Sequence, residues 1–249
     1  GGPVKKNKTF FFAGYHQQRQ ASTSATSFGA PSSAGWSALD GLFPSGRNER
    51  YDLFKKSLAG LTATSQFFPV TMGDNRPNIE FGTAGTTFPL TLTDKQLITR
   101  GDHSFSGKDT LMLRFIDQRQ SNGPAQNNLP AFITTQQIVN KNAQINETHI
   151  FSPYFTNELR TSYARIIFDF PLDAPAEFAK SIPTYTLGGG VPNIGIGTVF
   201  PQGRLANNYT LQDSISWIKG RHTIRSGVDL VAQRAKDLAP ARERGELAY

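Results

Sequence analysis

The fold is decided by residues 207–233, which read NNYTLQDSISWIKGRHTIRSGVDLVAQ. Apolar side chains occupy every second position from Tyr209 to Trp217, with Asp213 as the one interruption, and the positions between them carry Thr, Gln and Ser. Such alternation is typical of a β-strand that has one apolar and one polar face.

The next residues predict how this strand pairs. A glycine opens the dipeptide Gly220-Arg221, as a type II′ hairpin turn requires. This turn places Leu211 opposite Leu230, so that the apolar faces of the two strands coincide.

The whole chain shows seven such stretches, and their connections alternate between long and short. The long connections cover about 75, 23 and 38 residues, whereas a compact soluble domain rarely holds loops above about 15. Membrane β-barrels join their strands with tight periplasmic turns and long outer loops. We therefore predict an all-β, antiparallel transmembrane barrel sheet, with strands at Thr9–Arg19, Gln96–Ser106, Thr110–Arg119, Ala143–Ser152, Asn157–Phe168, Asn207–Lys219 and His222–Gln233.

Two other short turns set the remaining hairpins. A three-residue loop, Gly107-Lys108-Asp109, predicts that Phe105 lies opposite Leu111, and Pro153 marks the other turn. The apolar residues predicted to face lipid are Leu111, Leu113, Phe115, Leu211, Ile215, Trp217, Ile224, Val228 and Leu230. The charged residues predicted to face the lumen, where they pair with a plug or contact a passing ligand, are Arg100, Asp102, Arg114, Glu158 and Arg160.

Aromatic residues gather near both ends of the strands. Tyr209 and Trp217 lie on one face about 26 Å apart along the strand, or about 20 Å in height at a tilt near 40°. The apolar band of a barrel is about 25 Å tall and has aromatic girdles at its edges. The other aromatics are Phe105, Phe151, Tyr154 and Phe155 near the short turns, and Tyr15 and Phe168 near the long loops.

Composition limits the chemistry. The 249 residues include 23 Gly, 15 Pro and no Cys, which excludes disulfides, thiolate nucleophiles and Cys-ligated zinc. The formal net charge is +7, but the basic residues are dispersed without interleaved aromatics, so we expect no nucleic-acid partner. We expect no enzyme, metal or cofactor site, because His16, His103, His149 and His222 have no ligand spacing. The glycine-rich run 188–197 is expected to be a flexible outer-loop tip.

Seven strands cannot close a large barrel, and an open sheet in lipid leaves unpaired edges. We therefore interpret residues 1–249 as part of a larger barrel. The alternative is a soluble extracellular β-sandwich, such as an adhesin or a carbohydrate-binding module, in which the apolar faces would be buried together.

Four segments resemble TonB-dependent outer-membrane receptors, most closely the Oar-like group that carries an N-terminal carboxypeptidase-regulatory-like domain. GGPVKKNKTFFF at 1–12 resembles the junction between plug and first barrel strand. The other three look like barrel hairpins of that group: RGDHSFSGKD at 100–109, SP at 152–153 with NELR at 157–160, and DSISWIKGRH at 213–222.

The resemblance implies a barrel of roughly 22 strands with a plug in its lumen. It implies a receptor in the bacterial outer membrane that imports a bulky, scarce ligand with energy relayed through TonB. The implied partners are the lipid bilayer, the protein's own plug and TonB, whereas the ligand stays unknown. The plug, the TonB-contacting segment and the remaining strands are expected to lie outside residues 1–249.

Overall fold

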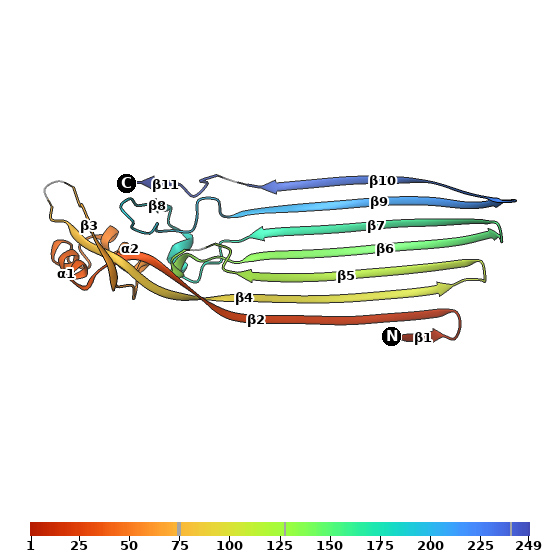
Figure 1. The fold of residues 1–249 in the computed structure, drawn as a ribbon, viewed down its shortest axis with the longest axis horizontal. Coiled ribbons are helices and arrows are strands. Elements are labelled where there is room, and N and C mark those ends of the chain that lie inside the picture. Colours follow the sequence, from red (N-terminus) through yellow and green to blue (C-terminus); the bar gives the residue numbers. More distant parts are fainter. Residues whose placement is uncertain (74–75, 127, 240) are drawn as a thin grey trace.

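One antiparallel sheet dominates the computed structural model, which describes residues 1–73, 76–126, 128–239 and 241–249. The strands follow one another across the sheet in chain order, and all seven predicted strands are present (Figure 1). The long strands are β2 (Thr9–Pro31), β4 (Ile79–Ser104), β5 (Asp109–Gly123), β6 (Gln136–Ser152), β7 (Phe155–Phe170), β9 (Gln202–Lys219) and β10 (His222–Leu238). Two short strands join them, β1 (Gly2–Lys5) on β2 and β3 (Ser65–Val70) on β4.

The C-terminal hairpin has the predicted geometry. Lys219 pairs with His222, and Leu211 pairs with Leu230. Gly220 has φ +61°, the left-handed backbone that a type II′ turn needs at its first central residue. The turn residue and the face pattern therefore specify the same register.

The hairpin of β4 and β5 corrects the predicted register. His103, not Phe105, lies opposite Leu111, a shift of two residues. The cause is a wider turn, in which the Ser106 hydroxyl accepts hydrogen bonds from the backbone N–H groups of Lys108 and Asp109. A shift of two leaves every side chain on its predicted face, because successive side chains alternate between faces.

The segment Gln20–Lys95, predicted as one long loop, is also corrected. β2 runs on to Pro31 and pairs with β4 without a break, down to the pair Pro31 and Phe81. The two strands twist together well past the other strands in Figure 1. Their outer parts are rich in Ser, Thr and Gly and lack alternation, so no periodic signal marks them.

The sheet has two free edges. Within the described residues, β10 pairs with β9 alone and β1 pairs with β2 alone. Every residue of β10 is exposed, and the sheet is not closed into a barrel. Among the residues that the structure describes, no helix has the length and apolar character needed to cross a bilayer.

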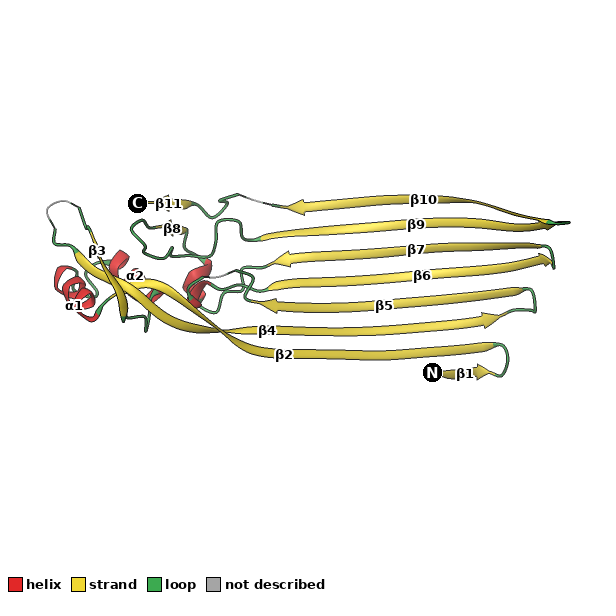
Figure 2. Cartoon of the chain, in the orientation of Figure 1, coloured by secondary structure: helices red, strands yellow, loops and turns green. Residues whose placement is uncertain are grey.

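The long connections fold together at one end, and we call this part the cap. Figure 2 shows that the helices are confined to this end, beyond the ends of β5, β6, β7, β9 and β10. The cap includes the outer ends of β2 and β4, β3, α1 (Ser33–Leu42), α2 (Glu49–Ser57), η1 (Pro130–Phe132), η2 (Glu177–Lys180), β8 (Thr184–Thr186) and β11 (Glu246–Ala248).

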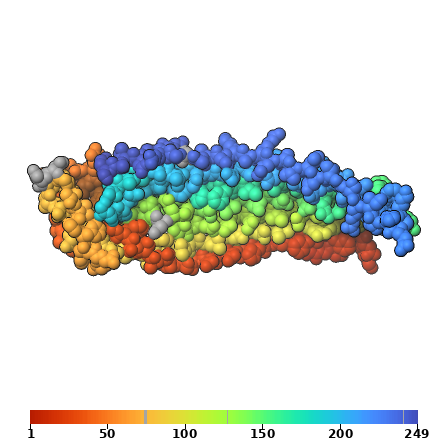
Figure 3. Space-filling view, turned by 45° about the horizontal axis from the view of Figure 1, so that its top comes forward, coloured from red at the N-terminus to blue at the C-terminus, as the bar shows by residue number. Residues whose placement is uncertain are grey.

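Buried side chains from all three long connections make up the core of the cap. Leu58, Phe132 and Ile196 are almost fully buried in one cluster although they are far apart in sequence. The run 188–197 is therefore no free tip, since Ile194 and Ile196 are core residues. In the space-filling view, the orange and cyan segments of the cap pack against each other at one end of the molecule (Figure 3).

Gly220 supplies a test of the hairpin geometry. Replacing Gly220 with Ala is expected to cost about 1–2 kcal/mol of unfolding free energy, because a Cβ is strained at positive φ. The measurement is urea unfolding of the protein in lipid vesicles. Gly107→Ala is the matched control, a turn glycine with open space around an added Cβ, and equal losses in both variants would refute the assigned turn.

Candidate functional site

The sheet register sorts the side chains into two faces. Residues paired across strands share a face, and one unbroken row joins Leu113, Ile145, Thr161, Leu211 and Leu230. We call this side the apolar face. It carries all nine residues that the sequence assigned to lipid, namely Leu111, Leu113, Phe115, Leu211, Ile215, Trp217, Ile224, Val228 and Leu230.

These apolar residues are not covered by a second layer. Leu113, Leu211, Ile215 and Leu230 are 47%, 40%, 38% and 56% exposed. A β-sandwich would bury them together in its core. Their exposure along a single sheet argues against the sandwich and leaves the assignment to lipid standing as a prediction.

The opposite side, the polar face, carries the five predicted lumen residues. Arg100 and Arg114 are direct cross-strand partners, and Asp102 forms an ion pair with Arg100 at 2.7 Å. On β7, Glu158 and Arg160 pair at 2.6 Å. Most of these charges are therefore neutralised within their own strand, each exposed pair contributing at most about 1 kcal/mol.

Arg114 is the exception among the five. Its guanidinium donates to the Gln144 side-chain oxygen at 2.6 Å and has no carboxylate partner within the described residues. Near β7, Glu158, Arg160, Gln212 and Asp229 line a shallow groove of about 350 Å³. The structure thus gathers the predicted charges into two groups, one on β4–β5 and one on β7, rather than into a single site.

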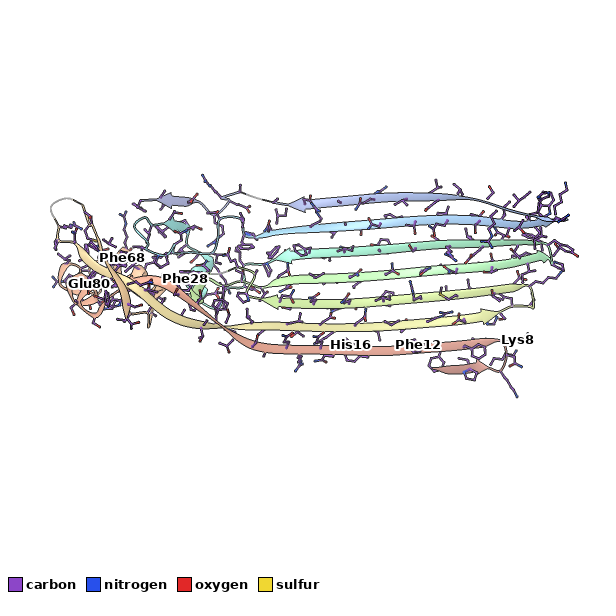
Figure 4. The ribbon with its side chains drawn as sticks, viewed as in Figure 1. Lys8, Phe12, His16, Phe28, Phe68 and Glu80 are labelled. Carbon is purple, nitrogen blue, oxygen red and sulfur yellow. The ribbon has the colours of Figure 1, made fainter. Side chains whose placement is uncertain are left out.

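Aromatic pairs lie at both ends of the apolar face. The rings of Tyr163 and Tyr209 are 5.1 Å apart across β7 and β9, and the Phe151 and Phe155 rings are 5.1 Å apart near the short turn. Phe168, predicted near the long-loop end, lies there but on the polar face, opposite Arg204. In Figure 4, Lys8 marks the short-turn end of β2, and Phe12 and His16 follow along the strand.

The cap contains an open cavity of about 840 Å³ between α1, α2, β3 and the segment around residue 188. Phe28, Phe68 and Glu80 lie at the cap end of the molecule in Figure 4. Aromatic and aliphatic side chains dominate the wall, and two arginines supply positive charge. The lining residues are Leu39, Phe43, Asn48, Arg50, Tyr51, Phe54, Pro69, Val70, Thr71, Met72, Arg76, Phe81, Leu187, Gly188, Gly189, Val191 and Tyr249.

Side chains at the N-termini fix the two helices that frame this cavity. Ser32 accepts a hydrogen bond from the Gly35 N–H at 3.0 Å at the start of α1. Asn48 accepts from the N–H groups of Arg50 and Tyr51, both at 3.1 Å, at the start of α2. These N-terminal side chains satisfy backbone N–H donors that a helix cannot pair internally.

A polar contact joins the two helices. Asp40 on α1 accepts hydrogen bonds from Lys55 at 2.7 Å and from the Tyr51 hydroxyl at 2.6 Å. Lys55 and Tyr51 hold the pKa of the Asp40 carboxyl below its ordinary value of 3.8. Burial, followed by the hydrogen bond to Asp40, raises the pKa of Tyr51 well above its usual range.

Sequence reasoning missed one cluster of metal-ligand type. Ligand atoms of Asp109, Glu147 and His149 lie within 4.8 Å of one another at the short-turn end. Asp109 contacts the His149 Nδ1 and accepts a hydrogen bond from the Ser106 hydroxyl at 2.9 Å. These two contacts fit a structural role in holding the turn. Cross-strand register brings these residues together, so no spacing in the sequence reveals them.

The Asp40 contact predicts how the cap responds to acid. A lowered pKa in the folded state means that the stabilisation is complete above the ordinary value of 3.8 and is lost as the pH falls through the lowered pKa. Hydrogen exchange of the α1 and α2 amides, corrected for intrinsic rates, should therefore show that protection falls only when the pH is below the ordinary value of 3.8. In Asp40→Asn this acid step should be missing, and its persistence would contradict the assignment.

The comparisons with known proteins agree with this architecture. The family model described as "Outer membrane beta barrel domain" matches residues 1–249. No curated protein and no solved structure matches the chain. The chain therefore belongs to the outer membrane β-barrel domain family, a family of the bacterial outer membrane.

Proposed function

We propose that residues 1–249 form part of the wall and the outer ligand-binding cap of a TonB-dependent receptor. The observation that carries the proposal is the cap itself. Three long connections on the same end of a barrel sheet fold into one body with a shared core and an open cavity of about 840 Å³. Loops without a binding role have no need of a common core, and a cavity of this size suits a bulky ligand.

The two faces of the sheet fit a wall between lipid and a filled lumen. Leucine, isoleucine and aromatic side chains stay exposed on the apolar face, as hydrocarbon contact requires. The polar face carries Arg100, Arg114 and Arg160, which suit contact with a plug or with a polar ligand. The two free edges are β10 on one side and, on the other, β2 with the short β1 paired to its first residues, and both call for further strands to complete the hydrogen bonding in lipid.

The ligand class follows from the cavity wall. Phe43, Phe54 and Met72 offer an apolar surface, and Arg50 and Arg76 lie at the same cavity. This combination favours an amphipathic ligand with an apolar body and an anionic group. The sandwich adhesin is not favoured, because it needs a second sheet that buries the apolar face, and the other sheet in the described residues is the two-stranded pair of β8 and β11 in the cap.

The assignment of faces predicts opposite results at neighbouring positions of β9. Leu211→Arg places a charge on the apolar face and is expected to cost about 2–4 kcal/mol of stability in a bilayer. Thr210→Arg, the matched control on the polar face, should cost less than about 1 kcal/mol. Urea unfolding in phosphatidylcholine vesicles measures both, and equal costs would refute the proposed orientation.

The cap cavity predicts where the ligand binds. Gly188→Phe should fill the cavity mouth without strain, because its Cβ would meet only the Tyr249 carbonyl oxygen, at 3.7 Å. The full protein is purified in detergent after exposure to an extract of growth medium, and mass spectrometry identifies the retained compounds. Gly188→Phe should lose the compound that the wild type retains.

The control is Gly85→Phe, at an exposed β4 position with open space and outside the cavity. It should retain the compound. Cells that carry the protein should accumulate the same compound, and a protonophore should abolish accumulation if TonB supplies the energy. Retention by Gly188→Phe would refute the cavity, and accumulation that resists the protonophore would refute TonB-coupled import.

A further inference from the structure

The apolar face changes its charge abruptly along the strands. Between the Trp217 row and the Tyr209 row, the described residues of this face on β5, β6, β7, β9 and β10 include no Lys or Arg. Beyond Tyr209, toward the cap, the described residues of this face include seven cations and two carboxylates, Asp117 and Asp169. The cations, which we call the basic belt, are Arg19, Lys95, Arg119, Lys141, Arg165, Arg234 and Lys236.

The height of the belt matches a membrane boundary. Arg119 and Arg165 each lie ten residues beyond the first residue of their strand, Asp109 and Phe155. A tilted barrel strand crosses a bilayer in about 9–11 residues. Because the long connections lie outside in such barrels, the belt falls at the outer headgroup level.

Three belt residues surround a depression on this face. Arg119, Lys141 and Arg165 line it together with Tyr163 and two aliphatic residues of β6 and β7, and its volume is about 520 Å³. Lys141 and Arg165 are direct cross-strand partners, although like charges placed opposite each other destabilise a sheet. Sharing one anion between them would remove this repulsion.

Among the described residues, no carboxylate forms an ion pair with Lys141 or Arg165. Asp117 lies directly opposite Lys141 in the register, but its ion pair is with Arg119, at 3.1 Å. The Arg165 Nε is buried and has no hydrogen-bond partner. A buried, unpaired guanidinium nitrogen is costly unless an acceptor from outside satisfies it.

The neighbouring residues identify what kind of anion fits. The Tyr163 ring lies on the bilayer side of the depression, and its hydroxyl donates to the Asn207 side chain at 2.8 Å. Tyrosine with an apolar ring and a bonded polar tip is typical of membrane interfaces. A ligand here therefore meets hydrocarbon below and cations above.

We propose that Arg119, Lys141 and Arg165 bind the phosphate of an anionic lipid headgroup in the outer leaflet. Arginine and lysine are the usual phosphate ligands in proteins, and two cations on one row can share its oxygens. The site lies on the outside of the wall, so it is separate from ligand import through the lumen. Its effect is to hold a specific lipid against β5, β6 and β7.

The test uses the full protein in phosphatidylcholine vesicles that contain lipid A with both phosphates. The triple variant Arg119→Gln, Lys141→Gln, Arg165→Gln should retain this lipid roughly 100-fold more weakly than the wild type through detergent washing. The matched control removes three polar-face arginines, Arg100→Gln, Arg114→Gln and Arg160→Gln. The control should retain the lipid as the wild type does.

Lipid A without its phosphates and free inorganic phosphate complete the test. The wild type should retain the dephosphorylated lipid as weakly as the triple variant does, and inorganic phosphate should not compete at equal concentration. Equal losses in the two triple variants, full retention of dephosphorylated lipid, or competition by free phosphate would overturn the proposal. If the triple variant fails to insert into the vesicles, the wild type is washed at high salt instead, because salt screens the contact between the cations and the phosphate. Retention of the lipid by the wild type that does not fall at high salt would overturn the proposal.

Discussion

The continuous antiparallel ladder from β1 to β10 is the constraint on which the rest of the structure depends. Each strand between the two edges satisfies its backbone groups on its neighbours, which is the condition for a sheet to exist in hydrocarbon. Because side chains alternate with a period of two, the ladder also fixes every face. If the pairing of β7 with β9 slipped by one residue, Leu211 would lie beside the polar face of β7. In the same way, Arg160 would lie beside the apolar face of β9.

The parts of the fold that the sequence predicts are those with strong local signals. The hairpin around Gly220 combines a turn residue with alternation on both strands, and its register is confirmed. At Phe105 the alternation gives the correct face, but the Ser106 hydrogen bonds widen the turn and shift the register by two. Local sequence therefore predicts the face on which a side chain lies more reliably than its cross-strand partner. The partner depends on the conformation of the turn, which the side chains of the turn decide.

The cap and its cavity escape sequence reasoning for a different reason. Leu58, Phe132 and Ile196 come from three separate connections, so no period or motif links them before they pack. The same holds for Lys141 and Arg165, which are adjacent only through the pairing of β6 with β7. The alternation of polar and apolar residues predicted both faces of the sheet. Clusters of charge on one face can be recognised only when the register between all the strands is known.

Both faces contain ion pairs between residues two apart on one strand, but they differ in which cations stay unpaired. On the polar face, Arg100 and Arg160 each pair with a carboxylate two residues away on their own strand, whereas Arg114 has no carboxylate partner within the described residues. On the apolar face, Lys141 and Arg165 repel each other and await an anion from outside. In the proposed receptor, the self-paired Arg100 and Arg160 face the lumen, and Lys141 and Arg165 hold a lipid phosphate at the outer boundary of the membrane.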